Sequence, residues 1–220
     1  MRFVAVLPYI HQGWSDACTS TLAPEFLANT VLVDNTRRNI GIMASHNRGI
    51  DRMREVDAEW LIVVSAAMRF GGPGGMDFVE ALAADRDHLV IEAAGVFGWH
   101  LIAFRRHALD LVGRWDENFT PYGFDDIDLS LRIQRAVGVD GRNGRVWTKV
   151  RGDWSDAGMA HSVHLGGVRT DTNALIDYFV SKWGRHPGAA DVLAYMHPFD
   201  DPSNPLGYWP MAPNGGRWDA

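Results

Sequence analysis

The sequence predicts an α/β fold: a mixed, mostly parallel sheet flanked by helices, in a single domain with a C-terminal extension. Short apolar runs of strand length alternate with segments of helical periodicity through the first half of the 220 residues. The early runs end in turn signals such as Pro8 and Asp34-Asn35, which is typical of buried strands. Hydrophobic residues make up 46% of the chain, enough for a sizeable core.

The apolar runs and periodic segments can be placed in order along the chain. The predicted strands cover residues 3–7, 30–33, 59–64, 89–93, 99–104 and 145–150. The predicted helices cover residues 43–56, 76–84, 106–112, 125–137, 172–183 and 189–196. An antiparallel pair is expected in the less regular second half. Because ligands of parallel sheets bind at the carboxyl ends of the strands, Pro8-Tyr9, Asp34-Asn35 and Ser65-Ala66-Ala67 are predicted to share one functional edge.

Composition excludes several classes of function. The net charge is −6 and no stripe of Lys or Arg is present, which argues against binding a nucleic-acid backbone. The single cysteine, Cys18, excludes an internal disulfide and a cysteine-based zinc cluster, and it fits a reducing, cytoplasmic location. The apolar residues 1–10 are too few to span a membrane and lack a signal-peptide pattern, so no membrane span is expected.

Three carboxylates, Asp125, Asp126 and Asp128, lie within four positions at the start of a predicted helix. Negative charge is favoured at that end of a helix, so capping explains one of them. Asp128 is also spaced to pair with Arg132 one turn later. Neither explanation accounts for three acids beside an aromatic-rich turn, so a catalytic role for this cluster is the competing hypothesis.

Other polar motifs carry weaker signals. Asp34 ends an apolar strand, where a carboxylate can accept hydrogen bonds from a nucleobase or ribose, although a simple turn role is the alternative. The glycine-rich segment 71–75 lacks the Lys-Ser/Thr ending of a phosphate-binding loop and is interpreted as a turn. His161 and His164, near Asp153 and Asp156, have residue types that can bind a metal, with a structural role as the alternative.

Several motifs, taken in order, resemble family 2 glycosyltransferases of the GT-A fold, a Rossmann-like architecture. The resemblance covers about residues 1–200. It is carried by Val33-Asp34-Asn35, Asn39-Ile40-Gly41, Asn47-Arg48-Gly49-Ile50, Phe104-Arg105-Arg106, residues 112–119, Tyr122–Arg132, His164-Leu165-Gly166-Gly167 and residues 178–184. Each motif is weak alone, and their order and spacing together are more specific.

The resemblance implies an inverting transfer of sugar from a nucleotide-diphosphate donor to an acceptor hydroxyl. Asp126 matches the second acid of the family's acidic pair and would be the general base, with Asp125 orienting the acceptor or Asp126. The implied nucleotide-binding residues are Pro8, Tyr9, Asp34, Asn35, Asn47, Ser65, Ala67 and Arg69. The implied acceptor or sugar contacts are Trp99, Tyr122 and Asp128, the last with the structural pairing to Arg132 as its alternative.

One departure from the family concerns the metal. The family places an Asp-x-Asp or Asp-Asp motif after its third strand to hold Mn²⁺ or Mg²⁺, and here Ser65 and Ala67 replace the acidic positions. Either no metal is used, or a ligand comes from elsewhere, with His164 the first candidate. Without a metal, the charge of the diphosphate would be balanced by basic side chains. The candidates are Arg69, ranked first, then Arg105, Arg169 and Lys182.

The predicted organisation is a GT-A-like domain over residues 1–197 and a Pro-, Gly- and Trp-rich tail over 198–220. Residues 1–105 form the nucleotide-binding half and residues 106–197 the acceptor-binding half. The acceptor stays open among glycans, proteins, lipid-linked glycans and modified nucleic acids. The alternative function is an inactive GT-A-like module that binds a nucleotide or glycan. A nucleotidyltransferase is a weaker alternative, because residues 8–16 contain no Lys or Arg for a phosphate-binding loop.

Overall fold

The computed structural model of the chain describes residues 1–120, 123–138, 146–157 and 171–187. Several of the predictions above lie outside these residues. They are the helix over 189–196, the tail over 198–220, Tyr122, His161, His164 and Arg169.

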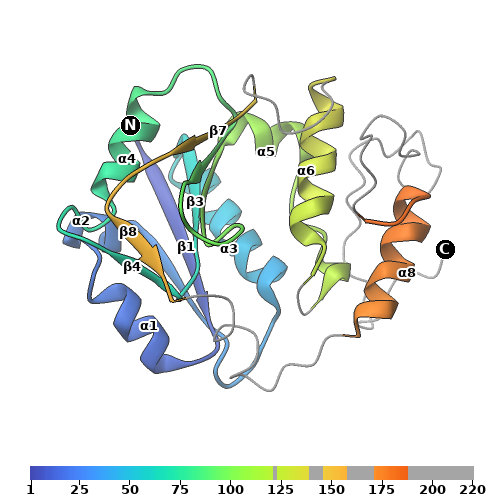
Figure 1. Cartoon of the computed structure of the whole chain (residues 1–220), viewed down its shortest axis with the longest axis horizontal. Helices are drawn as coiled ribbons and strands as arrows, with labels where there is room; N and C mark the ends of the chain where they lie inside the picture. Colours follow the sequence, from blue (N-terminus) through green and yellow to red (C-terminus); the bar gives the residue numbers. More distant parts are fainter. Residues whose placement is uncertain (121–122, 139–145, 158–170, 188–220) are drawn as a thin grey trace.

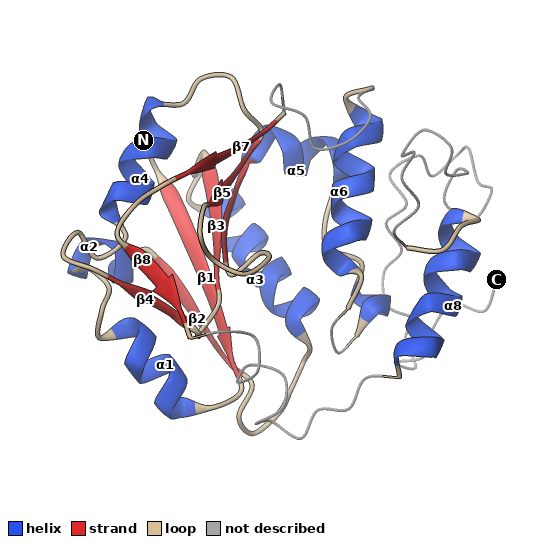
Figure 2. Ribbon diagram, viewed as in Figure 1, coloured by secondary structure: helices blue, strands red, loops and turns tan. Residues whose placement is uncertain are grey.

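A six-stranded sheet forms the centre of the described structure (Figure 2). Its strand order is β2-β1-β3-β6-β5-β7. The strands are β1 (Phe3–Tyr9), β2 (Thr30–Asp34), β3 (Trp60–Val64), β5 (Val90–Ala93), β6 (Leu101–Arg105) and β7 (Trp147–Val150). Strand β6 runs antiparallel to both neighbours, β3 and β5, and the other pairs are parallel. The predicted α/β class with a mixed, mostly parallel sheet is confirmed.

Helices cover both faces of this sheet (Figure 1). One face carries α3 (Ile42–Glu55), α5 (Arg106–Val112), α6 (Asp125–Ala136) and α8 (Thr172–Trp183). The other carries α1 (Gln12–Thr19), α2 (Pro24–Ala28) and α4 (Met76–Ala84). Alternate side chains of β1 enter the two cores, Val4 and Val6 on the first face and Ala5 and Leu7 on the second. This two-period alternation explains why the strand is apolar throughout.

Five short elements were not predicted from the sequence. They are α1, α2, the 3₁₀ turn η1 (Glu117–Phe119), and the antiparallel pair of β4 (Met68–Phe70) with β8 (Trp154–Asp156), which forms a separate two-stranded sheet. Helix α1 buries only Ser15 and Cys18, so its sequence carries no apolar stripe. Strands β4 and β8 have three residues each and pair with each other although they lie far apart in the sequence. A local sequence pattern therefore could not predict their pairing.

The carboxyl ends of the parallel strands meet at one edge of the sheet, as predicted. Tyr9 at the end of β1 lies opposite Asp34 at the end of β2, and β3 ends beside them at Val64. Helix α6 runs in the opposite sense to β1 and begins on the side where β1 ends (Figure 1). Among the described residues, no helix is long and apolar enough to cross a bilayer.

Candidate functional site

Tyr9 and Asp34 form the exposed polar part of the carboxyl edge. The Asp34 carboxylate accepts hydrogen bonds from Thr36, at 2.8 Å from its backbone N–H and 2.6 Å from its hydroxyl. These bonds, with the nearby Arg37 charge, lower the pKa of Asp34. Burial, together with the charges of Asp34 and Asp16, raises the pKa of Tyr9. The edge therefore presents an ionised carboxylate beside a neutral phenol, a pair suited to N–H and O–H donors of a ligand.

The turn that follows β3 contains no carboxylate. The Ser65 hydroxyl accepts a hydrogen bond from the Ala67 backbone N–H at 3.2 Å, and the Ser65 backbone N–H donates to the His100 carbonyl at 2.8 Å. Ala67 is buried, while Ser65 stays partly exposed. Asp156 lies opposite Met68 across the β4–β8 pair, and its carboxylate accepts from the Phe97 N–H and from His100 Nδ1.

Arg69 follows this turn and reaches back to it. Its Nη1 donates to the carbonyls of Ala66 at 3.0 Å and Met68 at 2.6 Å. The guanidinium also lies over the ring of Trp14 in α1, 5.6 Å from the ring centroid. Trp14 follows β1 closely in the chain, so Arg69 and Trp14 connect the ends of β1 and β3.

The acidic pair Asp125 and Asp126 opens α6 after a turn with left-handed backbone at Gly123 and Phe124 (φ 121° and 61°). Such a conformation is costly for a side chain as large as phenylalanine and is concentrated at functional turns. The Asp125 carboxylate accepts from the Gly123 N–H at 3.1 Å, and the Asp126 carboxylate accepts from the Ile127 N–H at 2.8 Å. Both side chains keep part of their surface exposed.

Burial, followed by the charge of Asp126, raises the pKa of Asp125 to about 7. Two carboxylates on one helical turn repel when both are ionised, which favours the protonated form of Asp125. A carboxylate at this position has the chemistry that a general base needs.

A buried ionic cluster lies directly behind this pair. Lys182 Nζ, on α8, lies 2.5 Å from the Asp116 carboxylate and 2.7 Å from the Asp128 carboxylate. Arg132 completes the charge balance with its Nε 2.9 Å from Asp128, and Trp183 Nε1 donates to Asp128 at 2.9 Å. The side chains of all four charged residues are fully buried. The cluster fixes α6 against α8 and so sets the position of the first turn of α6.

Helix α3 connects the segment before α6 to the carboxyl edge of the sheet. Asn47 donates to the Trp115 carbonyl at 3.0 Å and to Glu117 at 2.7 Å, and it accepts from the Trp115 N–H at 2.9 Å. The 3₁₀ turn η1 (Glu117–Phe119) is thereby held beside the first half of α3, which starts just after the loop at Asp34. The segment around η1 therefore lies beside the helix that begins at the carboxyl edge of the sheet.

Comparison with known proteins identifies the architecture. No family model matches the chain, and no curated protein matches it. Among solved structures, the chain is similar to the catalytic domain of Drosophila β1,4-galactosyltransferase 7 in complex with xylobiose, with a TM-score of 0.53 and 11% identity over 79% of this chain and 78% of that one. It is also similar to a Pyrobaculum calidifontis mannosyltransferase in complex with GDP-mannose and Mn²⁺, with a TM-score of 0.50 and 13% identity over 74% of this chain. It spans 59% of that enzyme.

The chain has a GT-A fold. The predicted architecture is thus confirmed, whereas identities of 11% and 13% carry no information on substrate or mechanism.

Two predicted nucleotide contacts, Asn35 and Asn47, form hydrogen bonds that support the fold. The side-chain NH₂ and carbonyl oxygen of Asn47 both form hydrogen bonds within the fold, to Trp115 and Glu117, as described above. Asn35 donates to Ser45 at 3.0 Å and accepts from the Ile40 N–H at 3.1 Å, which closes the loop after β2. Both residues are buried, so neither presents a polar group to a ligand. Sequence motifs could not separate these supporting roles from binding, because both need an amide at the same position.

Three other candidates have side chains that are engaged within the fold. Asp128 is a member of the buried cluster, which confirms its predicted pairing with Arg132 and leaves its side chain fully buried. Lys182 is used by that cluster and is not available to a diphosphate. Arg105 lies opposite Trp60 at the amino end of β3, where it pairs with Glu59 and Asp85, on the far edge from the turn after β3.

Trp99 is half-buried and packs with other aromatic rings. Its ring centroid is 5.3 Å from that of Phe104 and 6.4 Å from that of Trp147. The more exposed aromatic ring of the same loop is Phe97, whose surface is 52% exposed. The pairing of His100 with Asp156, at 3.1 Å, was also not predicted, because 56 positions separate the two residues.

A GT-A metal ion finds no matching ligands among the described residues. No group of three or more His, Cys, Asp or Glu side chains in the described ranges is arranged to hold a metal. The turn after β3 offers Ser65 and Ala67, and the nearby Asp156 is engaged by Phe97 and His100. The described part of this chain therefore does not fit Mn²⁺ or Mg²⁺, and the predicted ligand His164 lies outside it.

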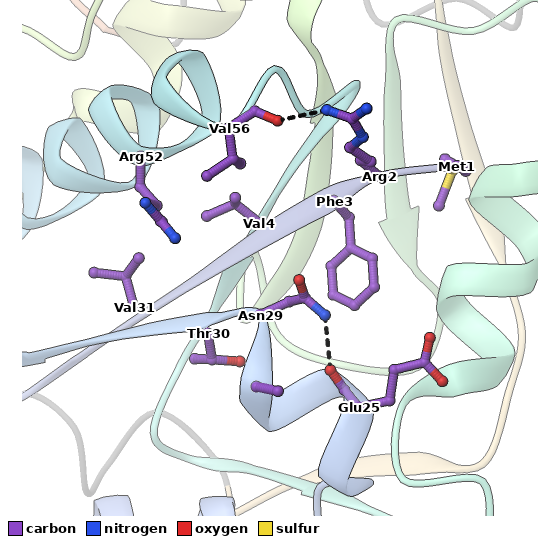
Figure 3. A pocket seen from close by; sticks show the side chains of 11 residues that line it. Met1, Arg2, Phe3, Val4, Glu25, Asn29, Thr30, Val31, Arg52 and Val56 are labelled. Carbon is purple, nitrogen blue, oxygen red and sulfur yellow. Dashed lines mark hydrogen bonds between the residues drawn. The ribbon is translucent and has the colours of Figure 1, made fainter.

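A cavity of about 390 Å³ opens at the other edge of the sheet (Figure 3). It is lined by the first residues of β1 and β2 and by side chains of α2 and α3, among them Arg2, Asn29 and Arg52. Arg2 donates to the Val56 carbonyl at 3.1 Å and Asn29 to the Glu25 carbonyl at 2.9 Å. Because ligands of open α/β sheets bind at the carboxyl ends of the strands, this cavity is not the candidate site.

Proposed function

We propose that the chain is an inverting glycosyltransferase that moves a sugar from a nucleoside-diphosphate sugar to an acceptor hydroxyl. The proposal is carried by the acidic pair Asp125 and Asp126, which opens α6 on the side where the parallel strands of a GT-A sheet end. A domain that only binds a ligand has no need for two neighbouring carboxylates at this position. The fold neighbours, named as a galactosyltransferase and a mannosyltransferase, support the same class of reaction.

In this reaction Asp126 acts as the general base. The acceptor hydroxyl gives its proton to the Asp126 carboxylate while its oxygen attacks the anomeric carbon of the donor sugar. The bond from that carbon to the diphosphate oxygen breaks, and the nucleoside diphosphate leaves with the electron pair from the opposite face. Asp125, whose pKa is raised by burial and by the charge of Asp126, lies beside the base and orients the acceptor hydroxyl or Asp126.

The donor is assigned to the carboxyl edge of the sheet. Asp34 accepts hydrogen bonds from the nucleoside, and Pro8 and Tyr9 border it. All three residues lie at the ends of β1 and β2, and the Asp34 carboxylate is exposed. A cytoplasmic location stays a prediction from composition.

Substitution of the base tests the function. Asp126→Asn removes the proton acceptor and keeps the shape, so release of nucleoside diphosphate should fall about 100-fold or more. Release is measured with UDP-, GDP- and dTDP-sugars over a panel of sugar acceptors, and calorimetry should give donor dissociation constants within about twofold of wild type. The matched control is Asp87→Asn, which changes an exposed acid away from α6 and should leave the rate unchanged.

Two results would contradict the proposal. Wild-type turnover that survives Asp126→Asn would show that another residue is the base. Tight nucleotide binding without turnover for any pair of donor and acceptor would instead support the inactive binding module. That alternative has one specific observation in its favour, the lack of a carboxylate in the turn after β3.

A further inference from the structure

The turn after β3 differs from a cation site in its charge as well as in its ligands. Ser65 and Ala67 bring no negative charge, and Asp156, which lies opposite Met68, accepts hydrogen bonds from Phe97 and from His100. A diphosphate bound here would meet no free carboxylate from the turn itself. It would therefore need a positive group rather than a bridging cation.

Arg69 provides such a group, because no acid in the described part of the chain neutralises it. The described residues offer its guanidinium two backbone carbonyls through Nη1 and no carboxylate, and they offer no partner to Nε or Nη2. Other arginines with restricted exposure are paired: Arg105 with Glu59 and Asp85, Arg114 with Asp51, and Arg132 with Asp128. A half-buried cation without a counter-ion is costly unless an anionic ligand completes it.

The surroundings of Arg69 also orient it. The hydrogen bonds to two backbone carbonyls fix Nη1 at the turn. The guanidinium Cζ lies over the ring of Trp14, 5.6 Å from the ring centroid. The planar guanidinium is thus held at Nη1 by the carbonyls and on one face by the Trp14 ring. Its edge formed by Nε and Nη2 stays open for two parallel hydrogen bonds to a ligand. Guanidinium groups bind phosphate oxygens in this bidentate manner, and their weak hydration favours partly buried positions.

We infer that Arg69, positioned by Trp14, binds the diphosphate of the donor directly, so that this GT-A domain holds its nucleotide without a divalent cation. The inference rests on the proposed function for the identity of the anion as a nucleoside diphosphate. During transfer the same guanidinium stabilises the negative charge that develops on the leaving diphosphate.

Calorimetric titration of UDP, GDP and dTDP into the full chain tests this, each in EDTA and in Mn²⁺. One nucleotide should bind in EDTA, with a dissociation constant that changes less than about threefold in Mn²⁺. Arg69→Gln should weaken that nucleoside diphosphate about tenfold or more and leave the corresponding nucleoside unchanged, because only the diphosphate meets the guanidinium. Arg52→Gln is the charge-matched control, since Arg52 is exposed on α3 and paired with Glu55.

The outcomes separate the two proposals. Binding that requires Mn²⁺, or a diphosphate affinity equal in Arg69→Gln and wild type, overturns the inference and leaves the glycosyltransferase proposal intact. Absence of binding for all three nucleotides in both buffers overturns the proposed function itself. If Arg69→Gln does not fold, Arg69→Lys keeps the charge and loses the fork. A nucleoside-diphosphate affinity that stays unchanged in Arg69→Lys then counts against bidentate binding.

Discussion

The two halves of the domain treat their charges in opposite ways. In the half predicted to bind the acceptor, Asp116, Asp128, Arg132 and Lys182 are fully buried and neutralise one another. At the carboxyl edge of the half predicted to bind the nucleotide, the Asp34 carboxylate is exposed and Arg69 has no acid partner among the described residues. Buried charges must be paired within the protein, whereas charges at the edge can be completed by a ligand. The difference therefore separates residues that hold the fold from residues that can bind.

The acidic run at the start of α6 shows this division within four positions. Asp128 is buried, and its carboxylate interacts with Lys182, Arg132 and Trp183. Asp125 and Asp126 keep part of their surface exposed and form bonds only with nearby backbone in the described structure. The three acids look alike in the sequence, and only burial separates the structural Asp128 from the partly exposed Asp125 and Asp126.

The largest expected effect comes from breaking the buried cluster. Lys182→Met leaves Asp116 and Asp128 without their shared cation, so the free energy of unfolding should fall by about 3–5 kcal/mol. Urea denaturation followed by circular dichroism measures it. The control Arg52→Met removes an exposed cation paired with Glu55 and should change stability by less than about 0.5 kcal/mol. A loss below about 1 kcal/mol for Lys182→Met would mean that the cluster does not hold the acceptor half.

A smaller effect is expected at the carboxyl edge, on binding rather than on stability. Asp34→Ala removes an exposed acceptor, so the dissociation constant of the bound nucleotide should rise about tenfold while thermal stability stays near that of wild type. Thr36→Val is the matched control, because it removes a hydroxyl partner and keeps the carboxylate. An unchanged dissociation constant for Asp34→Ala would exclude Asp34 from the nucleotide site.

A third effect is a pH dependence of stability that arises from the acidic pair. The folded pKa of Asp125, about 7, lies above its ordinary value of 3.8, so the native state binds more protons than the unfolded chain between these values. The stabilising contribution is complete below pH 3.8 and is lost as the pH rises through about 7, with a slope of at most about 1.4 kcal/mol per pH unit.

Urea denaturation at a series of pH values measures this slope for wild type, Asp125→Asn and the exposed-site control Asp87→Asn. The difference between wild type and Asp125→Asn should change with pH over that window, and Asp87→Asn should follow wild type. A pH-independent difference would show that Asp125 titrates normally in the folded chain.

Local periodicity was sufficient for the long elements but not for the short ones. The predicted helix over 76–84 coincides with α4, and the helix over 172–183 coincides with α8, because each has an apolar face and a clear stop. Helices α1 and α2 and the β4–β8 pair were missed. They are short, and their stability comes from contacts across the chain, such as Gly71 N–H to the Asp153 carbonyl at 2.7 Å.

The sequence by itself determined the α/β class, the sheet edge where the parallel strands end, and the acidic pair at the start of α6, since apolar spacing and turn residues are local properties. Only the tertiary structure decided which polar side chains remain available to a ligand. Asn35, Asn47, Asp128 and Lys182 are satisfied by partners inside the fold, some of them more than fifty positions away, whereas Asp34 and Arg69 keep capacity to bind. The physical reason is that burial forces a polar group to find an internal partner, and burial is a property of the packed chain.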